Sequence, residues 1–162
     1  MATSPKPGIE IAQASTSGQL DQARELFLEY ADSLGFSLCF QGFEDELKNL
    51  PGSYAPPAGR LLLAHHNNHP AGCVALRPID RQICEMKRLY VRPGHRGTGI
   101  GQMLVDRVIT EAGAAGYERM RLDTIESSMQ NAIALYRRKG FVEIAPYRSN
   151  PIAGALYLEL LL

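Results

Sequence analysis

The stretch that decides the fold runs from Glu85 to Gln102 and reads EMKRLYVRPGHRGTGIGQ. Its first seven residues suit a β-strand, which Arg92-Pro93-Gly94 would end. The loop that follows is rich in glycine, at Gly97, Gly99 and Gly101. Because glycine has no side chain, a ligand can approach the backbone of this loop closely. Apolar residues then recur at helical spacing from Ile100, so the stretch predicts a strand, a tight loop and the start of a helix.

The loop has the features of an anion-binding site. The first amides of the predicted helix have no partner within it, and the helix dipole places positive charge at this end. Arg92, His95 and Arg96 add basic side chains at the same place. We therefore expect the loop to bind a phosphate or pyrophosphate. A sharp turn with solvated arginines is the alternative. The loop is neither a Walker motif, which ends in Gly-Lys-Ser/Thr, nor a dinucleotide fingerprint.

Two sequence signatures together identify a family resemblance. Residues 96–101 read RGTGIG and fit the pattern Arg/Gln-x-x-Gly-x-Gly/Ala of the GNAT acetyltransferase superfamily. Residues 131–141 read NAIALYRRKGF and resemble the second signature of that superfamily, which ends in Leu-Tyr-x-x-x-Gly-Phe. The resemblance covers roughly residues 61 to 162, and the first third of the chain matches only in length and in the order of its elements.

The resemblance implies a single-domain α/β (α+β) fold, with a central mixed sheet that is splayed, mostly antiparallel and flanked by helices. A hairpin is predicted from Arg60–His65 and Ala71–Arg77, and helices alternate with strands in the second half of the chain. In this fold the strand before the glycine loop and the strand after its helix, here residues 119–124, run parallel but separate. The resemblance implies that acetyl-CoA lies between them.

Length, charge and composition limit the alternatives. The 162 residues fit one domain, which we place at residues 9–162 after a flexible N-terminus at residues 1–8. Lysine and arginine together equal aspartate and glutamate, at 17 each, which argues against a nucleic-acid partner. No apolar run is long enough to cross a membrane. Cys73 and Cys84 stand among apolar residues, as expected of reduced, buried thiols, and we expect a cytoplasmic location.

The resemblance also implies which residues bind acetyl-CoA, the co-substrate. Amides of the glycine loop would hold the pyrophosphate, strand backbone would pair with the pantetheine arm, and the helix of the second signature would add side chains. The residues concerned are Leu89, Tyr90, Val91, Arg96, Gly97, Thr98, Gly99, Ile100, Gly101, Gln102, Asn131, Tyr136 and Arg138. For Arg138 and its basic neighbours, complementing the negative end of their own helix is the alternative role.

Tyr136 is the predicted general acid. A phenol stays protonated at neutral pH and can donate its proton to the departing thiolate. A core tyrosine on an apolar helix face is the alternative, and the match to the family tyrosine favours the catalytic role. The family also implies a bulge near Leu89 or Tyr90 that would turn a backbone amide toward the oxyanion.

Glu85 is the predicted general base. An acidic residue is uncommon in the middle of a strand, and the offset of Glu85 from Arg96 resembles that of the glutamate base in histone-acetyltransferase-like members. The alternative is a structural ion pair with Lys87, Arg88 or Arg77. Such a pair would lower the pKa of Glu85 and make it a poorer base.

The acceptor is predicted to be the primary amine of a small molecule, with an amino-acid-like molecule favoured. Residues 34–57 and 146–154 would form its site, and arginines there can hold a carboxylate. The candidate side chains are Tyr54, Arg77, Arg88 and Tyr147. Asp123 could bind the amine or pair with Arg121 or Arg119.

Two other functions stay open: N-terminal acetylation of a peptide, and a CoA-binding sensor without turnover. The presence of both Glu85 and Tyr136 argues against the sensor. We expect no metal, because the histidines His65, His66 and His69 fall in a predicted hairpin turn without a nearby carboxylate or thiol. The last predicted strand, residues 155–162, could pair with a second copy in a homodimer or lie inside the sheet.

Overall fold

The computed structural model describes residues 6–38, 42–127 and 129–162. Its strands are β1 (Ile9–Gln13), β2 (Arg60–His66), β3 (His69–Pro78), β4 (Ile83–Val91), β5 (Arg119–Ile125), β6 (Val142–Glu143) and β7 (Ala155–Leu161). Its helices are α1 (Ser17–Ser33), α2 (Phe43–Lys48), α3 (Ile100–Ala114) and α4 (Gln130–Arg138), with short 3-10 turns at Gly52–Tyr54 and Pro93–His95.

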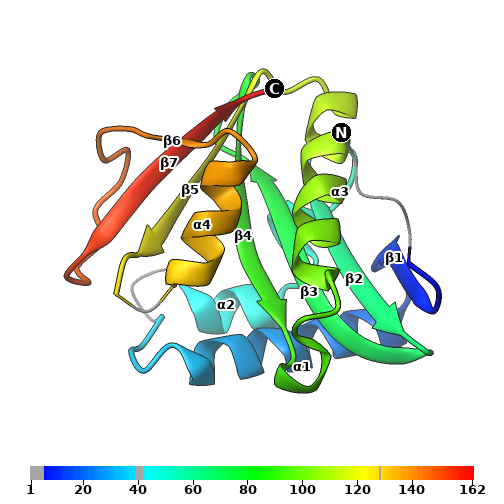
Figure 1. The fold of residues 1–162 in the computed structure, drawn as a ribbon. Coiled ribbons are helices and arrows are strands. Elements are labelled where there is room, and N and C mark those ends of the chain that lie inside the picture. Colours follow the sequence, from blue (N-terminus) through cyan, green and yellow to red (C-terminus); the bar gives the residue numbers. More distant parts are fainter. Residues whose placement is uncertain (1–5, 39–41, 128) are drawn as a thin grey trace.

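The strands form one sheet in the order β1-β2-β3-β4-β5-β7-β6 (Figure 1). Neighbouring strands are antiparallel except β4 and β5, which are parallel and are connected through α3. The predicted mixed, mostly antiparallel sheet is therefore confirmed. The last strand, β7, lies between β5 and β6, so the second of its two predicted placements is the correct one.

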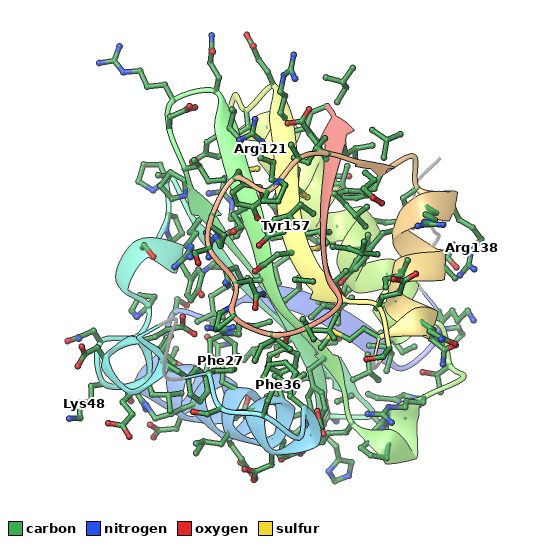
Figure 2. All side chains as sticks on the ribbon, turned by 90° about the vertical axis from the view of Figure 1, so that its left-hand side faces the viewer. Phe27, Phe36, Lys48, Arg121, Arg138 and Tyr157 are labelled. Carbon is green, nitrogen blue, oxygen red and sulfur yellow. The ribbon has the colours of Figure 1, made fainter. Side chains whose placement is uncertain are left out.

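Helices cover both faces of the sheet, and each face has its own apolar core (Figures 1 and 2). On one face, α1 and α2 pack through residues such as Leu26, Phe27 and Phe43 against Leu61 and Leu63 of β2. Leu62 points to the other face, together with side chains of α3 and α4. The alternation along β2 is the period of two expected of a strand that is buried on both sides.

Thr16 caps the start of helix α1. Its hydroxyl accepts a hydrogen bond from the Gln19 amide, and the Gln19 side-chain oxygen accepts one from the Thr16 amide. This reciprocal capping box satisfies two amides at once. At the other end of the helix, Gly35 follows the C-cap with a positive φ of 74°.

Strand β4 contains a β-bulge that positions the site. Cys73 of β3 pairs with Tyr90, and Ala75 pairs with Lys87, so β4 has one residue more than β3 between these pairs. Arg88 in the bulge has a φ of 62°, which is uncommon for a residue with a side chain. The bulge implied near Leu89 or Tyr90 is thus confirmed.

Beyond the bulge, β4 separates from β5. The two strands pair only at their beginnings, where the last pair joins Glu85 to Arg121. Beyond that pair β5 stays hydrogen-bonded to β7 as far as Ile125. The predicted splay is therefore present, and it leaves an edge of β4 open beside the glycine loop.

Three further expectations concern the N-terminus, the cysteines and membrane-crossing segments. Residues 1–5 of the predicted flexible N-terminus lie outside them, whereas Lys6 donates a hydrogen bond from Nζ to the carbonyl oxygen of Thr98, at 3.0 Å. Cys73 and Cys84 are buried free thiols, as expected. Among the helices described, none is both long and apolar enough to cross a membrane.

Candidate active site

The glycine loop and the first turn of α3 form the anion cradle that the sequence predicts. Gly97 and Gly99 have φ values of 81° and 87°, in the left-handed region that favours glycine. Gly99 is the N-cap of α3 and offers no side chain to the first amides of the helix, which stay available to a ligand. A groove of about 720 Å³ runs from this loop between β4 and α4.

The groove contains most of the residues predicted to bind acetyl-CoA. Eleven of them line it: Leu89, Tyr90, Val91, Arg96, Gly97, Gly99, Ile100, Gly101, Gln102, Asn131 and Arg138. The two predicted residues absent from its lining are Thr98, whose hydroxyl donates to the carbonyl oxygen of His95, and Tyr136, which lines a neighbouring cavity. The strand, the loop and α4 therefore all contribute to one groove.

The basic residues around the loop divide into two groups. Arg96 lines the groove and donates from Nε to the carbonyl oxygen of Val91, at 3.0 Å. Arg92 was expected in the cradle but instead binds Glu29 of α1, with 2.6 Å between its terminal nitrogen and the carboxylate. His95 lines the groove and contacts His66, with 3.0 Å between their Nδ1 atoms. The described residues hold no group of three or more His, Cys, Asp or Glu placed to bind a metal.

A second, smaller cavity of about 60 Å³ opens beside the bulge. Its polar wall contains Lys87 and Arg88 of β4, Asp123 of β5 and Asn150 of the loop before β7. The remaining wall is largely apolar, with Leu34, Phe36, Leu38, Met86, Leu122 and Ile125 among its members. Four residues line both this cavity and the groove, namely Tyr30, Leu89, Met129 and Ala132. The two spaces therefore meet at the splay between β4 and β5.

Tyr136 lies on the wall of this cavity. Its side chain packs against Phe141 and is 6% exposed. Burial, with a smaller contribution from nearby Tyr30, raises the pKa of Tyr136 above the usual range of a phenol, so it is protonated at neutral pH. Its hydroxyl makes no hydrogen bond to any of the described residues and is available to a ligand.

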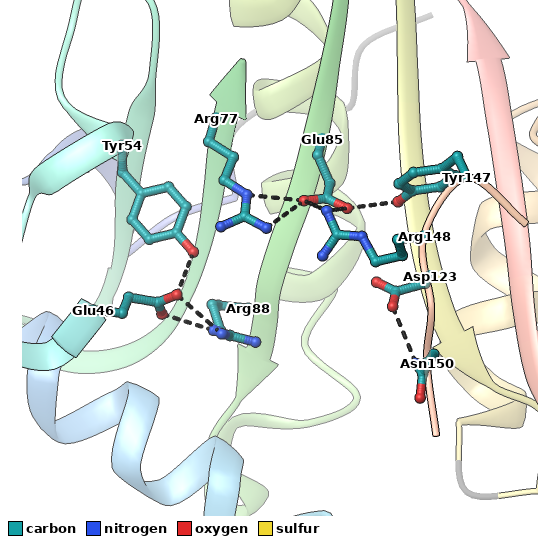
Figure 3. Close-up of polar contacts among 9 residues, drawn as sticks. All are labelled: Glu46, Tyr54, Arg77, Glu85, Arg88, Asp123, Tyr147, Arg148 and Asn150. Atoms are coloured by element: carbon teal, nitrogen blue, oxygen red, sulfur yellow. Dashed lines mark hydrogen bonds and ion pairs between the residues drawn. The ribbon is translucent and has the colours of Figure 1, made fainter. Parts of the chain in front are cut away.

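Glu85 has the ion-pair environment that was the alternative to a role as base. It is fully buried and binds Arg77 directly across the β3–β4 ladder, at 2.9 Å. Arg148 and the hydroxyl of Tyr147 approach from the loop before β7, at 2.7 and 2.6 Å (Figure 3). Burial by itself raises the pKa of Glu85, but Lys87 and these donors outweigh it, and the pKa lies below its usual value.

The four candidate acceptor residues all contact a carboxylate of the chain itself (Figure 3). Arg77 and Tyr147 bind Glu85, as described above. Arg88 forms two hydrogen bonds with Glu46, at 2.8 and 3.0 Å, and Tyr54 donates to the same carboxylate at 2.9 Å. Of these four residues, Arg88 is the member that lines the cavity.

Sequence reasoning missed several residues that shape the cavity. Lys87 was considered only as a partner of Glu85, although both lie on one face of a central strand, which is itself an unusual pattern. Tyr30 and Asn150, which also line the cavity, had no distinguishing signal in the sequence. Asp123 does not pair with Arg119 or Arg121, because both bind Glu159, at 2.9 and 2.8 Å.

Comparison with known proteins agrees with this geometry. The model of the acetyltransferase (GNAT) family matches residues 20–141. The chain belongs to the GNAT acetyltransferase family. An uncharacterized N-acetyltransferase of Schizosaccharomyces pombe is 40% identical over 154 residues, which are 94% of each chain. The predicted superfamily and acyltransferase class are thus confirmed.

Solved structures of GNAT proteins share the fold. An acetyltransferase from Streptococcus agalactiae has a TM-score of 0.78 at 23% identity, covering 97% of this chain and 100% of that one. A GNAT family acetyltransferase from Elizabethkingia anophelis, solved with acetyl-CoA bound, has a TM-score of 0.67 at 25% identity, with the same coverage.

Proposed function

We propose that this GNAT protein transfers the acetyl group of acetyl-CoA directly to the primary amine of a small molecule that also carries a carboxylate. The observation that supports this most is the junction of the two spaces at the β4 bulge. A long groove with an anion cradle at one end leads to a small polar cavity at the other. A donor in the groove and an acceptor in the cavity would meet there.

The residues of the groove fit acetyl-CoA. The bare amides at Gly97, Gly99 and Gly101 suit a pyrophosphate, and Arg96 and Arg138 add positive charge. The groove, at about 720 Å³, lies within the range of pockets that hold molecules of this class. Once bound, acetyl-CoA supplies an activated acyl group as its thioester.

The transfer forms a bond between the amine nitrogen and the acetyl carbon and breaks the carbon–sulfur bond. An acceptor that arrives as an ammonium ion releases two protons, one to solvent and one to the departing thiolate. We propose that Tyr136 relays the second proton: its hydroxyl, protonated and unpartnered among the described residues at the cavity wall, donates its proton to the thiolate and regains one from the amine. The backbone amide at Leu89, beside the bulge, is proposed to stabilise charge on the acetyl oxygen.

The acceptor cavity favours a small molecule over a peptide. Its volume of about 60 Å³ suits a compact molecule better than a peptide segment. Among the described residues that line it, two are cationic, Lys87 and Arg88, and one is a carboxylate, Asp123. The excess of one positive charge suits an acceptor that brings a carboxylate.

A thiol-release assay with acetyl-CoA and a panel of amines tests this function. The panel contains free amino acids, simple alkylamines and peptides with a free N-terminus, and mass spectrometry identifies the acetylated product. We expect amine-dependent thiol release that is greatest with carboxylate-bearing small amines. Acetyl-CoA binding without release for any amine would instead indicate a sensor, and exclusive activity on peptides would indicate an N-terminal acetyltransferase.

A further inference from the structure

Asp123 is a cavity carboxylate whose expected arginine partners are engaged elsewhere. It lies beyond the last pair between β4 and β5, where the strands have separated. The hydrogen bond seen at its carboxylate comes from Nδ2 of Asn150, at 3.1 Å (Figure 3). An ionised carboxylate can accept about four hydrogen bonds, so one amide leaves Asp123 able to bind a further donor from a ligand.

Lys87 shares the cavity with this carboxylate, whereas Arg148 lies in the neighbouring loop and is not among the cavity-lining residues. Lys87 is 6% exposed, lines the same cavity and interacts electrostatically with Asp123. Arg148, two residues before Asn150 in the loop, binds Glu85 through a terminal nitrogen. Its Nε is buried and has no hydrogen-bond partner among the described residues.

We propose that Asp123 binds the ammonium group of the acceptor, and that Lys87, which lines the same cavity, binds its carboxylate. The small cavity requires the two charged groups of the ligand to be close together, which makes the acceptor an α-amino acid. The apolar wall, with Leu34, Phe36 and Leu122, would then contact an apolar side chain of that amino acid. This inference rests on the proposed function and specifies the substrate of the same site.

The arrangement predicts discrimination against amines that lack a carboxylate. Such an amine brings no carboxylate for Lys87 to bind, and a site built to bind a polar group rejects ligands that lack it. We expect kcat/KM for an apolar α-amino acid to exceed that for its decarboxylated amine by at least about 10²-fold. Suitable pairs, with compact apolar groups, are valine with 2-methylpropylamine and leucine with 3-methylbutylamine.

Substitutions of Lys87 and of Asp123 should have different effects on the kinetic constants measured for these pairs. Lys87→Met should lower kcat/KM for the amino acid by about 10²-fold and leave the value for the amine nearly unchanged, so that the preference collapses. Asp123→Asn should raise KM for both members of a pair. Lys48→Met is the matched control, because Lys48 is an exposed lysine of α2 remote from the cavity, and it should change neither value (Figure 2).

The ratio of the wild-type kcat/KM values for an amino acid and its decarboxylated amine tests the proposal even if a variant fails to fold. A wild-type kcat/KM for the amine within about threefold of that for its parent amino acid would overturn the proposal. A Lys87→Gln variant that binds acetyl-CoA normally and keeps the full preference for the amino acid would also overturn it. If the wild type transfers no acetyl group at all, the proposed function fails separately. In that case titration of leucine and 3-methylbutylamine into the CoA-loaded protein decides the matter: the proposal requires tighter binding of leucine, and equal or absent binding contradicts it.

Discussion

At the scale of single residues, Tyr136 carries the most specific chemical claim. Tyr136→Phe removes one hydroxyl and keeps the ring that packs against Phe141. If the hydroxyl protonates the thiolate, turnover at saturating acetyl-CoA should fall about 10²–10⁴-fold while acetyl-CoA affinity barely changes. Steady-state kinetics, a CoA titration and a melting curve on the same preparation measure all three quantities.

Tyr117→Phe is the matched control for that variant. Tyr117 is also buried, but its hydroxyl donates to the carbonyl oxygen of Ala58, away from the cavity. Loss of this hydroxyl should lower the free energy of unfolding by about 1 kcal/mol and leave turnover intact. If Tyr136→Phe behaves like this control in single-turnover measurements of acetyl transfer, Tyr136 is a core residue and not the acid.

Glu85 leads to a prediction about stability and its pH dependence. Glu85→Gln removes a buried charge that neutralises Arg77 and Arg148, so the free energy of unfolding at pH 7 should fall by about 3–5 kcal/mol. Because the pKa of Glu85 is lowered in the folded state, its stabilising contribution is complete above the ordinary value of 4.5 and is lost as the pH falls below it. The difference in the free energy of unfolding between wild type and Glu85→Gln, measured by urea denaturation, should therefore be smaller at pH 4 than at pH 7.

The same variant also tests the predicted role of Glu85 as base. A structural Glu85 predicts that the folded fraction of Glu85→Gln retains most of its turnover. A catalytic base predicts a large loss of turnover that shrinks at high pH, where more of the amine is already neutral. Turnover per folded molecule, measured from pH 6 to pH 9, separates the two roles.

The residue types at the site could be predicted from the sequence better than their partners. The Arg77–Glu85 pair was among the alternatives, because both residues lie on neighbouring strands of a predicted sheet. Tyr147 and Arg148 reach Glu85 from a loop more than sixty positions later in the chain. No periodicity or spacing links such segments, so only the folded structure shows that Glu85 is neutralised from both sides.

At the scale of elements, the glycine loop makes the clearest prediction. Gly99→Val adds a branched side chain beside the groove at a residue with a φ of 87°. Its Cβ would meet the end of the flexible Lys6 side chain, 2.7 Å from Nζ, which would have to move. We expect loss of acetyl-CoA binding, measured by isothermal titration, because the side chain would occupy the space of the pyrophosphate. Gly116→Val is the control, since Gly116 has a φ of 94° in the turn after α3 and open space around it.

Comparison of the two variants separates backbone strain from blocked binding. Both should lose stability, because a branched residue at positive φ is strained. Only Gly99→Val should lose affinity for acetyl-CoA. A folded Gly99→Val protein with unchanged affinity would show that the loop is only a turn.

The elements themselves were largely predictable, but their irregularities were not. Alternating apolar residues predict β4 and β5, and the alternation of helix and strand predicts that they are parallel. The extra residue at Arg88 leaves no mark in the sequence, because the bulge depends on how β3 pairs with β4. Its presence was implied only by the family resemblance, as was the separation of the two strands.

At the scale of the whole molecule, the account depends on segments that are distant in the sequence. The junction of groove and cavity takes Tyr30 from α1, Leu89 from β4, and Met129 and Ala132 from the start of α4. The fold brings these segments together at the splay of the sheet (Figure 1). The two sequence signatures predict the contributions of β4 and α4. The contribution of α1 follows only from the way the first third of the chain packs across the sheet.

The central claim is that the groove of the folded protein binds acetyl-CoA, and thermal unfolding with and without this ligand tests it most directly. Ligand that binds only the folded state, at about 100 times its dissociation constant, should add about 2.7 kcal/mol to the free energy of unfolding. For a domain of this size the account therefore predicts a rise of several degrees in Tm, which Gly99→Val should abolish. An unchanged Tm for the wild type at millimolar acetyl-CoA would contradict the account.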